Sequence, residues 1–347
     1  MSNEETKPIE AVEPYNGIVD DPRTEEEKAL DFIHEELFSA PLAGAAVWEE
    51  RKPKKFPIRN QDGSSACVAF AMAKILGIDE VYEGREFVEL SPRDMYVRRT
   101  NQGGGMYLPE AMDISRKHGM TLEALVPSDD KGETAMNKWD GINAETDKIA
   151  LKYKSAGRVE IPVDIEAIAA ITSMGKGVLL GHRFDYDEWT TYPTVNPNSK
   201  RSCGHGTAGV DNVLENGIKY IVMDDSWGPH YAEFGQRHLD KNWIDKRVFY
   251  AGYTMNFIYD GSQETDKPHY TFTKWMKRNE KSADVVALQN ILKYEGLFPM
   301  NTESTGLYGP ATQRGVKNFQ IKHGIKHNNG VQAGPSTIAK LNELYSK

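Results

Sequence analysis

The sequence predicts an α+β domain with a helical lobe and a β-rich lobe, followed by a small all-α domain of three helices. Helical patterns dominate up to about residue 125, whereas strand patterns dominate from Gly177 onwards. Near the C-terminus, three helical segments alternate with two similar turns that each contain Gly-Pro. A chain of 347 residues is long enough for two domains with separate cores.

These changes of pattern divide the chain into four segments. They are an acidic arm with a short amphipathic helix (1–44), the two-lobed domain (45–260), a polar linker (261–282) and the three-helix domain (283–347). Within the arm, we expect residues 1–23 to be mobile because they are polar, acidic and contain prolines. Aromatic residues such as Tyr270 and Phe272 indicate that part of the linker packs.

Composition and charge narrow the classes of function. The net charge of −9 argues against a general nucleic-acid-binding protein, and no apolar stretch is long enough to span a membrane. Only Cys67 and Cys203 are present as cysteines, so the fold needs no disulfide framework. Because the N-terminus is acidic and lacks an apolar segment, we expect no signal peptide and a soluble protein made in the cytoplasm.

The central motif of the two-lobed domain is a polar loop that leads directly into a cysteine. Residues 60–66, Asn-Gln-Asp-Gly-Ser-Ser-Ala, precede Cys67, and an apolar stretch follows from Val68 to Leu76. Unpaired backbone N–H groups and the helix dipole at such a helix start favour a nucleophilic thiolate. Gln61 lies close enough in sequence to form an oxyanion hole with the Cys67 N–H. The alternative is a cysteine that only fills the core.

This segment resembles the nucleophile region of papain-like cysteine peptidases, which has a Gln, a Gly- and Ser-containing loop, the cysteine and an apolar helix. Two positions depart from the family. Val68 stands where an aromatic residue is usual, and Ser64 stands where the family has a disulfide cysteine. The resemblance implies a papain-like fold, with the nucleophile in the helical lobe and its partners across a cleft in the β-rich lobe.

His205 is the candidate partner of the cysteine. It lies in the segment Cys-Gly-His-Gly at 203–206, which opens an apolar strand, and it follows Cys67 by 138 residues. The histidine of papain-like enzymes follows the cysteine by about 130–150 residues. The spacing therefore favours a catalytic role over a structural one.

Asp225 is the candidate for the third residue. Residues 224–228, Asp-Asp-Ser-Trp-Gly, resemble the Asn-Ser-Trp-Gly turn of the family, with Asp225 in the place of Asn. Either side chain can accept the imidazole N–H and fix its tautomer, and a carboxylate also favours the imidazolium. Trp227 would shield this hydrogen bond from water, or simply fill the core. Asp224 is the alternative candidate for the third residue.

A glycine-rich loop supplies the candidate substrate contacts. Residues 103–105 are three consecutive glycines, of which Gly104 and Gly105 are the last two, and Met106 follows them. Glycine permits close approach of another backbone. The resemblance implies that Gly104 and Gly105 line the cleft and pair with the substrate backbone. It places Met106 near the site for the second residue before the cleaved bond. The alternative is a flexible loop.

The resemblance thus implies a peptidase that needs no metal or other cofactor. A Cys67 thiolate paired with a His205 imidazolium would attack a peptide carbonyl, while Gln61 and the Cys67 N–H hold the oxyanion. No His or Cys cluster has the spacing of a metal site. The amphipathic helix at 24–38 is either a brace on the main domain or a short inhibitory pro-segment, as papain-like enzymes often carry. The alternative function is an inactive protein that binds peptides.

Residues 283–347 resemble the three-helix peptidoglycan-binding domain. The matching features are Gly-Leu-Tyr-Gly at 306–309, Val-x-x-Phe-Gln at 316–320 and a closing Gly-x-x-Thr at 334–337. The resemblance implies binding to bacterial peptidoglycan, with a spacer or docking module as the alternative. The whole chain is therefore expected to be a cysteine endopeptidase with a polypeptide substrate, directed to the bacterial cell wall and encoded by a bacteriophage.

Overall fold

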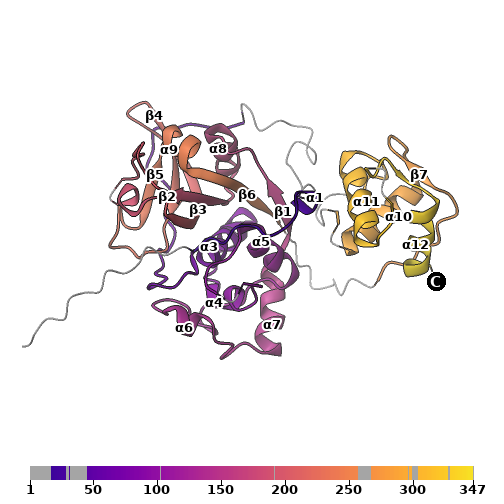
Figure 1. Ribbon diagram of the computed structural model, residues 1–347, viewed down its shortest axis with the longest axis horizontal. Coiled ribbons are helices and arrows are strands. Elements are labelled where there is room, and N and C mark those ends of the chain that lie inside the picture. Colours follow the sequence, from indigo (N-terminus) through magenta and orange to yellow (C-terminus); the bar gives the residue numbers. More distant parts are fainter. Residues whose placement is uncertain are drawn as a thin grey trace, which may run out of the picture.

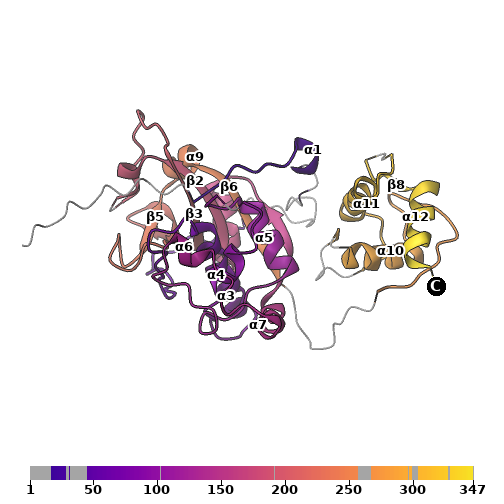
Figure 2. The ribbon, with the colours of Figure 1, turned by 60° about the horizontal axis from the view of Figure 1, so that its bottom comes forward.

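The computed structural model describes residues 17–28, 31, 45–101, 103–190, 192–256, 267–295, 297–298, 304–326 and 329–346. A helical lobe and a sheet lobe pack against each other (Figure 1), and the C-terminal residues form a separate helical module (Figure 2). Within these ranges, no helix has the length and apolar character that crossing a bilayer requires.

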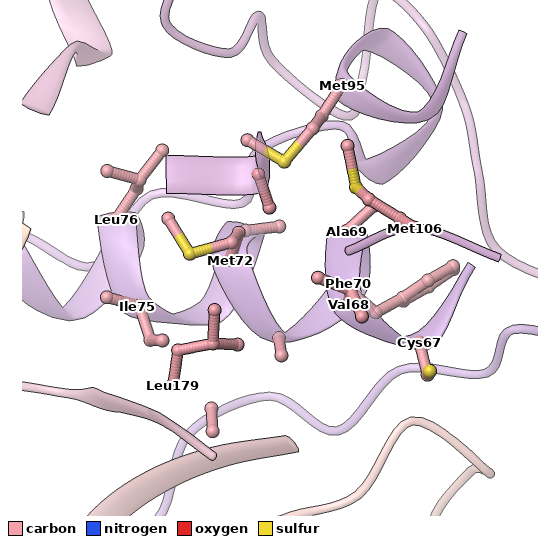
Figure 3. Close-up of a cluster of buried hydrophobic side chains, with 14 of the residues drawn as sticks. Cys67, Val68, Ala69, Phe70, Met72, Ile75, Leu76, Met95, Met106 and Leu179 are labelled. Carbon is pink, nitrogen blue, oxygen red and sulfur yellow. The ribbon is translucent and has the colours of Figure 1, made fainter. Parts of the chain in front are cut away.

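The helical lobe is built around α3 (Cys67–Tyr82), which is buried along nearly its whole length. A helix with apolar residues on every side must lie at the centre of a core, and residues 67–78 interrupt their apolar run only with Lys74 and Gly77. Its side chains pack with Met95, Met106 and Leu179 from other segments (Figure 3). The helices around it are α4 (Pro92–Tyr96), α5 (Leu108–Lys117), α6 (Glu133–Met136), α7 (Ala144–Ala150) and the 3₁₀ helix η1 (Leu151–Tyr153).

The second lobe is an antiparallel sheet of six strands in the order β1-β6-β2-β3-β4-β5. The strands are β1 (Ser155–Glu160), β2 (Val178–Phe184), β3 (Cys203–Glu215), β4 (Ile218–Asp224), β5 (Gln236–Leu239) and β6 (Val248–Asn256). Neighbouring residues of a strand point to opposite faces. Leu179 therefore joins the α3 core, whereas Val178 and Leu180 join a second core with α8 (Ile165–Ser173) and α9 (Lys241–Arg247). The sheet is covered on both faces, and α3 lies against β3.

Two strands of this sheet were not expected from the sequence. The strand patterns that begin at Gly177 predict β2, β3, β4 and β6, whereas the sequence does not predict β1 and β5, which lie at the two edges of the sheet. Their sequences, Ser-Ala-Gly-Arg-Val-Glu and Gln-Arg-His-Leu, have little strand pattern. Pairing with β6 and β4 creates these strands, because tertiary context overrides a weak propensity.

The C-terminal module has a core of its own, formed between α10 (Ala283–Tyr294), α11 (Pro310–Lys322) and α12 (Pro335–Tyr345). One device occurs twice in it. Gln289 Nε2 donates to Thr312 Oγ1 at 2.9 Å, and Gln320 Nε2 donates to Thr337 Oγ1 at 2.9 Å. Each glutamine ties its helix to the first turn of the next one, which explains why the two turns are alike in sequence.

Part of the predicted linker belongs to this module. Phe272 and Met276 are buried in its core, and β7 (Met276–Lys277) pairs with β8 (Gln332–Ala333). The Tyr270 N–H donates to the Tyr345 carbonyl at 2.8 Å. The module therefore reaches back to Tyr270 and carries a two-stranded ribbon beside its three helices.

The N-terminal arm also differs from the expectation. Residues 17–23, which were expected to be mobile, make defined contacts: Ile18 is only 2% exposed, and Arg23 pairs with Asp31 at 2.8 Å. Of the helix expected at 24–38, the structure describes α1 (Glu25–Lys28). Apart from Asp31, the rest of that prediction lies outside the described residues.

Candidate active site

Cys67 is the first residue of α3, at the point where the polar loop meets the helix (Figure 3). Its Sγ accepts a hydrogen bond from the Gly206 N–H at 3.3 Å. This contact depends on a close approach of β3 to α3, because a Cβ atom at position 206 would lie 2.7 Å from Cγ2 of Val68. Any side chain at position 206 would therefore push the strand away from the helix that carries the nucleophile.

The structure brings His205 and Asp225 together beside Cys67. His205 lies on β3, Asp225 directly follows β4, and His205 Nε2 is 2.8 Å from Asp225 Oδ1. All three residues are at most 3% exposed. Burial lowers the pKa of His205, but the charge and hydrogen bond of Asp225, with smaller contributions from Cys67, raise it to about 9. The imidazole is thus protonated at neutral pH. Because Nε2 faces Asp225, Nδ1 is the ring nitrogen left to interact with the thiol.

The raised pKa of His205 predicts how peptide hydrolysis depends on pH. We expect the rate to hold from neutral pH towards about 9 and to fall above it, because the imidazole then loses the proton that it gives to the leaving amine. Initial rates on a fluorogenic peptide measure this limb, with recovery of activity on return to neutral pH as the control for unfolding. A fall centred on the ordinary imidazole pKa of about 6.5 would contradict the prediction.

The carboxylate of Asp225 is held on both sides. Oδ1 faces His205 and also accepts the Ser226 N–H at 2.8 Å. Oδ2 accepts Nε1 of Trp189 at 2.9 Å and Nε of Arg237 at 2.8 Å. Burial raises the pKa of Asp225, but His205 and Arg237 outweigh burial and hold the pKa well below its usual range. Sequence reasoning missed Trp189 and Arg237 because neither lies in a motif segment.

Asp224, the alternative third residue, is engaged elsewhere. Lys74 Nζ lies 2.8 Å from its Oδ2, and Gln236 Nε2 donates to its Oδ1 at 2.9 Å. Both oxygens of Asp224 therefore have partners other than His205, and Asp225 is the carboxylate beside the imidazole.

Gln61 is held within the loop that precedes the nucleophile. Its Nε2 donates to the Ser64 carbonyl, and its Oε1 accepts from the Ser226 Oγ at 2.6 Å. The amide has a second N–H, which is the donor that the predicted oxyanion hole requires. Trp227 lies next to the imidazole, with its ring centroid 5.3 Å from that of His205. Trp227 therefore lies in a position from which it can shield the hydrogen bond between His205 and Asp225 from water.

The glycine-rich loop faces the histidine strand from the helical lobe. Gly104 and Gly105 have φ of +92° and +72°, a left-handed conformation that glycine adopts at little cost. The Gly105 N–H donates to the Tyr96 hydroxyl at 2.9 Å, which fixes the loop. Met106 is fully buried in the α3 core. Its backbone N–H and carbonyl, and not its side chain, are therefore the groups that can bind a neighbouring segment.

Part of the N-terminal arm crosses between these two walls. The Gly17 N–H donates to the Gly204 carbonyl at 3.0 Å, and the Gly17 carbonyl accepts from the Met106 N–H at 3.1 Å. A Cβ atom at position 17 would overlap the Sγ of Cys67. The backbone of Gly17 therefore lies directly over the nucleophile.

The next two residues extend this pairing. The Val19 N–H donates to the Met106 carbonyl at 3.1 Å, and the buried Ile18 belongs to the same hydrophobic cluster as Met106. Ile18 thus takes the place that the sequence assigned to a substrate side chain near Met106. We call residues 17–19 the covering segment.

Cys203 takes no part in this arrangement. It is buried, and burial is the main reason that the pKa of its thiol is raised. Among the residues that the structure describes, no three or more His, Cys, Asp or Glu side chains are placed so that they could hold a metal ion.

Comparison with known proteins places both parts of the chain. The chain is 28% identical over 221 residues to cysteine protease Amb a 11.0101 of Ambrosia artemisiifolia, covering 61% of this chain and 53% of that protein. It is 27% identical over 236 residues to the senescence-specific cysteine protease SAG12 of Arabidopsis thaliana, covering 63% of each. The chain therefore spans less than two thirds of the length of these relatives.

A solved structure resembles the two-lobed part of the chain, and a family model matches its C-terminal module. Xylellain, a cysteine protease from Xylella fastidiosa, superposes with a TM-score of 0.60 at 17% identity, over 71% of this chain and 97% of that one. Residues 281–341 match the family model described as "Putative peptidoglycan binding domain". The chain thus has the papain-like fold and papain-like cysteine proteases as its relatives. It carries in addition a C-terminal domain of the peptidoglycan-binding type.

Proposed function

We propose that this protein is a cysteine endopeptidase. The observation that carries the proposal is the buried row of Cys67, His205 and Asp225, with 2.8 Å between His205 Nε2 and Asp225 Oδ1. The Cys67 thiolate would attack a peptide carbonyl, and the imidazolium would give its proton to the leaving amine. Water would then cleave the thioester, while the Cys67 N–H and the free N–H of Gln61 hold the oxyanion.

The full chain would be a latent form of this enzyme. The covering segment occupies both backbone partners across the cleft and lies on Sγ, so a substrate reaches Cys67 only after the segment has left. The sequence suggested an inhibitory role for the helix at 24–38, whereas the contact with the nucleophile comes from residues that precede that helix.

The C-terminal module would direct the enzyme to bacterial peptidoglycan. The family match at 281–341 and the separate core of the module support this proposal. The substrate would then be a protein associated with the wall or a peptide of peptidoglycan itself, and a bacteriophage is the source that we propose.

An epoxysuccinyl peptide that alkylates papain-like cysteines tests the proposed activity. We expect a single adduct on Cys67 in the full chain and faster labelling in Gly17→Val, whose side chain would displace the covering segment. Cys203→Ser is the matched control and should label as the parent does, whereas Cys67→Ser should not label. If mass mapping places the adduct elsewhere, or finds none in either chain, the protein is not such a peptidase.

A further inference from the structure

Arg237 is a fully buried cation beside the candidate catalytic residues. It lies on the edge strand β5, and its side chain is 0% exposed. Besides Asp225, it donates to the carbonyl of Thr190. Its guanidinium carbon lies 4.8 Å from the ring centroid of Trp189 and 5.7 Å from that of Trp227. The aromatic rings and the carboxylate together give this charge a defined position.

The donors on Asp225 Oδ2 decide which side chain fits at position 225. Arg237 Nε and Trp189 Nε1 both donate to that oxygen. An asparagine that keeps its oxygen towards His205 would turn its NH₂ group towards these two donors, and no hydrogen bond forms between donors. Rotating the amide would instead present its NH₂ group to the imidazole. Asparagine, which fits this position by sequence alone, therefore conflicts with Arg237.

The charges around the imidazole also depend on Arg237. His205 faces Cys67 from α3, Asp225 from the end of β4 and, across the β2–β3 pair, His182. Burial lowers the pKa of His182 to about 3, and Trp243 donates to its Nδ1, so His182 is neutral. In the thiolate–imidazolium pair of the proposed mechanism, Cys67 and Asp225 supply two negative charges, and His205 and Arg237 supply two positive ones. Removing either charge of the Asp225–Arg237 pair leaves the imidazolium in an unbalanced field.

We propose that Arg237 is a positioning residue of the active site: it holds Asp225 so that Oδ1 faces His205, and it cancels the charge of the carboxylate. The proposal rests on the catalytic roles given above for Cys67, His205 and Asp225. In this arrangement Asp225 and Arg237 act as one unit with no net charge, which accepts the hydrogen bond of the imidazole as an uncharged side chain would do alone. Substituting both residues should therefore be tolerated better than substituting Asp225 alone.

Four full-length chains test this dependence: the parent, Asp225→Asn, Arg237→Gln and the double variant. The measurement is the pH dependence of Cys67 labelling by the epoxysuccinyl peptide. We expect Asp225→Asn to label about 30- to 100-fold more slowly at neutral pH, the loss expected for a charge-assisted hydrogen bond. The pH above which labelling falls should be lower in Asp225→Asn than in the parent, because the positive charge of Arg237 is then unpaired beside the imidazolium. In Arg237→Gln alone that pH should be higher, because no positive side chain then offsets the charge of the Asp225 carboxylate.

The double variant carries the decisive result. Its new glutamine removes the unpaired charge and offers an oxygen to the NH₂ group of its new asparagine, so labelling should recover about tenfold or more over Asp225→Asn. Arg247→Gln is the matched control, because Arg247 is also buried and pairs with Glu188 instead. It should lower stability and leave the pH profile unchanged. A double variant no faster than Asp225→Asn, or an Asp225→Asn chain within about threefold of the parent, would overturn the proposal.

The titration of His205 followed by NMR in the same proteins separates this inference from the proposed activity. The pKa of His205 should be lowest in Asp225→Asn, highest in Arg237→Gln and intermediate in the double variant. If no chain is labelled but this order is found, the peptidase proposal fails and the positioning role stands. If Cys67 is labelled but the order is absent, the positioning role fails alone.

Discussion

Replacing Gly17 by valine should expose the nucleophile. We expect the rate of Cys67 alkylation by iodoacetamide to rise about tenfold or more, because a closed state favoured by about 1.4 kcal/mol leaves only about a tenth of the molecules open. The Cβ atom of a valine at this position cannot coexist with Sγ of Cys67, so the substitution acts on the closed state alone. Mass mapping of the alkylated cysteines measures the effect, and labelling of the buried Cys203 should stay slow.

Asp20→Ala is the matched control for this substitution. Asp20 follows the covering segment and pairs with Arg183, but its side chain is 88% exposed. Exposed ion pairs contribute little, so labelling of Cys67 should change less than about threefold. Equal labelling rates for Gly17→Val and the parent chain would show that the covering segment does not restrict access to Cys67.

Removing residues 267–347 should abolish binding to bacterial sacculi and leave cleavage of soluble peptides unchanged. The buried residues of the module all come from Phe272 onwards. The cut therefore removes the whole core of the module and leaves both cores of the two-lobed domain intact. Cutting at residue 283 instead would strand Phe272 and Met276, whose burial sites lie in the module. The measurement is the fraction of protein that pellets with sacculi, and we expect a loss of about tenfold or more.

The inactive full-length chain Cys67→Ala controls this experiment, since it should pellet as well as the parent does. A truncated protein that pellets equally would place wall binding in the two-lobed domain. Loss of peptide cleavage along with the module would mean that the two parts depend on each other to fold.

Much of the candidate site could be predicted because its residues lie in continuous segments with strong local patterns. The loop before Cys67, the glycines around His205 and the turn after β4 each combine a polar signal with an adjacent apolar element. Such elements are decided largely by local sequence, so placing them also placed the side chains that they carry.

The missed features depend on contacts that the local sequence does not encode. Arg237 lies on a strand with the sequence Gln-Arg-His-Leu, which exists because β4 supplies its pairing partners. The covering segment lies within an arm that is polar and acidic by composition, and its backbone hydrogen bonds come from the two walls of the cleft. Composition describes the isolated chain and cannot reveal a binding site for it elsewhere in the fold.

The covering segment has a consequence for how the enzyme would respond to its substrate. A tethered occupant acts at an effective concentration of order millimolar, which dilution of the protein does not change. A free peptide would have to approach that concentration to compete for the cleft. Substrate crowded on a surface to which the C-terminal module is bound would meet this requirement locally. The two ends of the chain would then jointly restrict proteolysis to the place where the module is anchored.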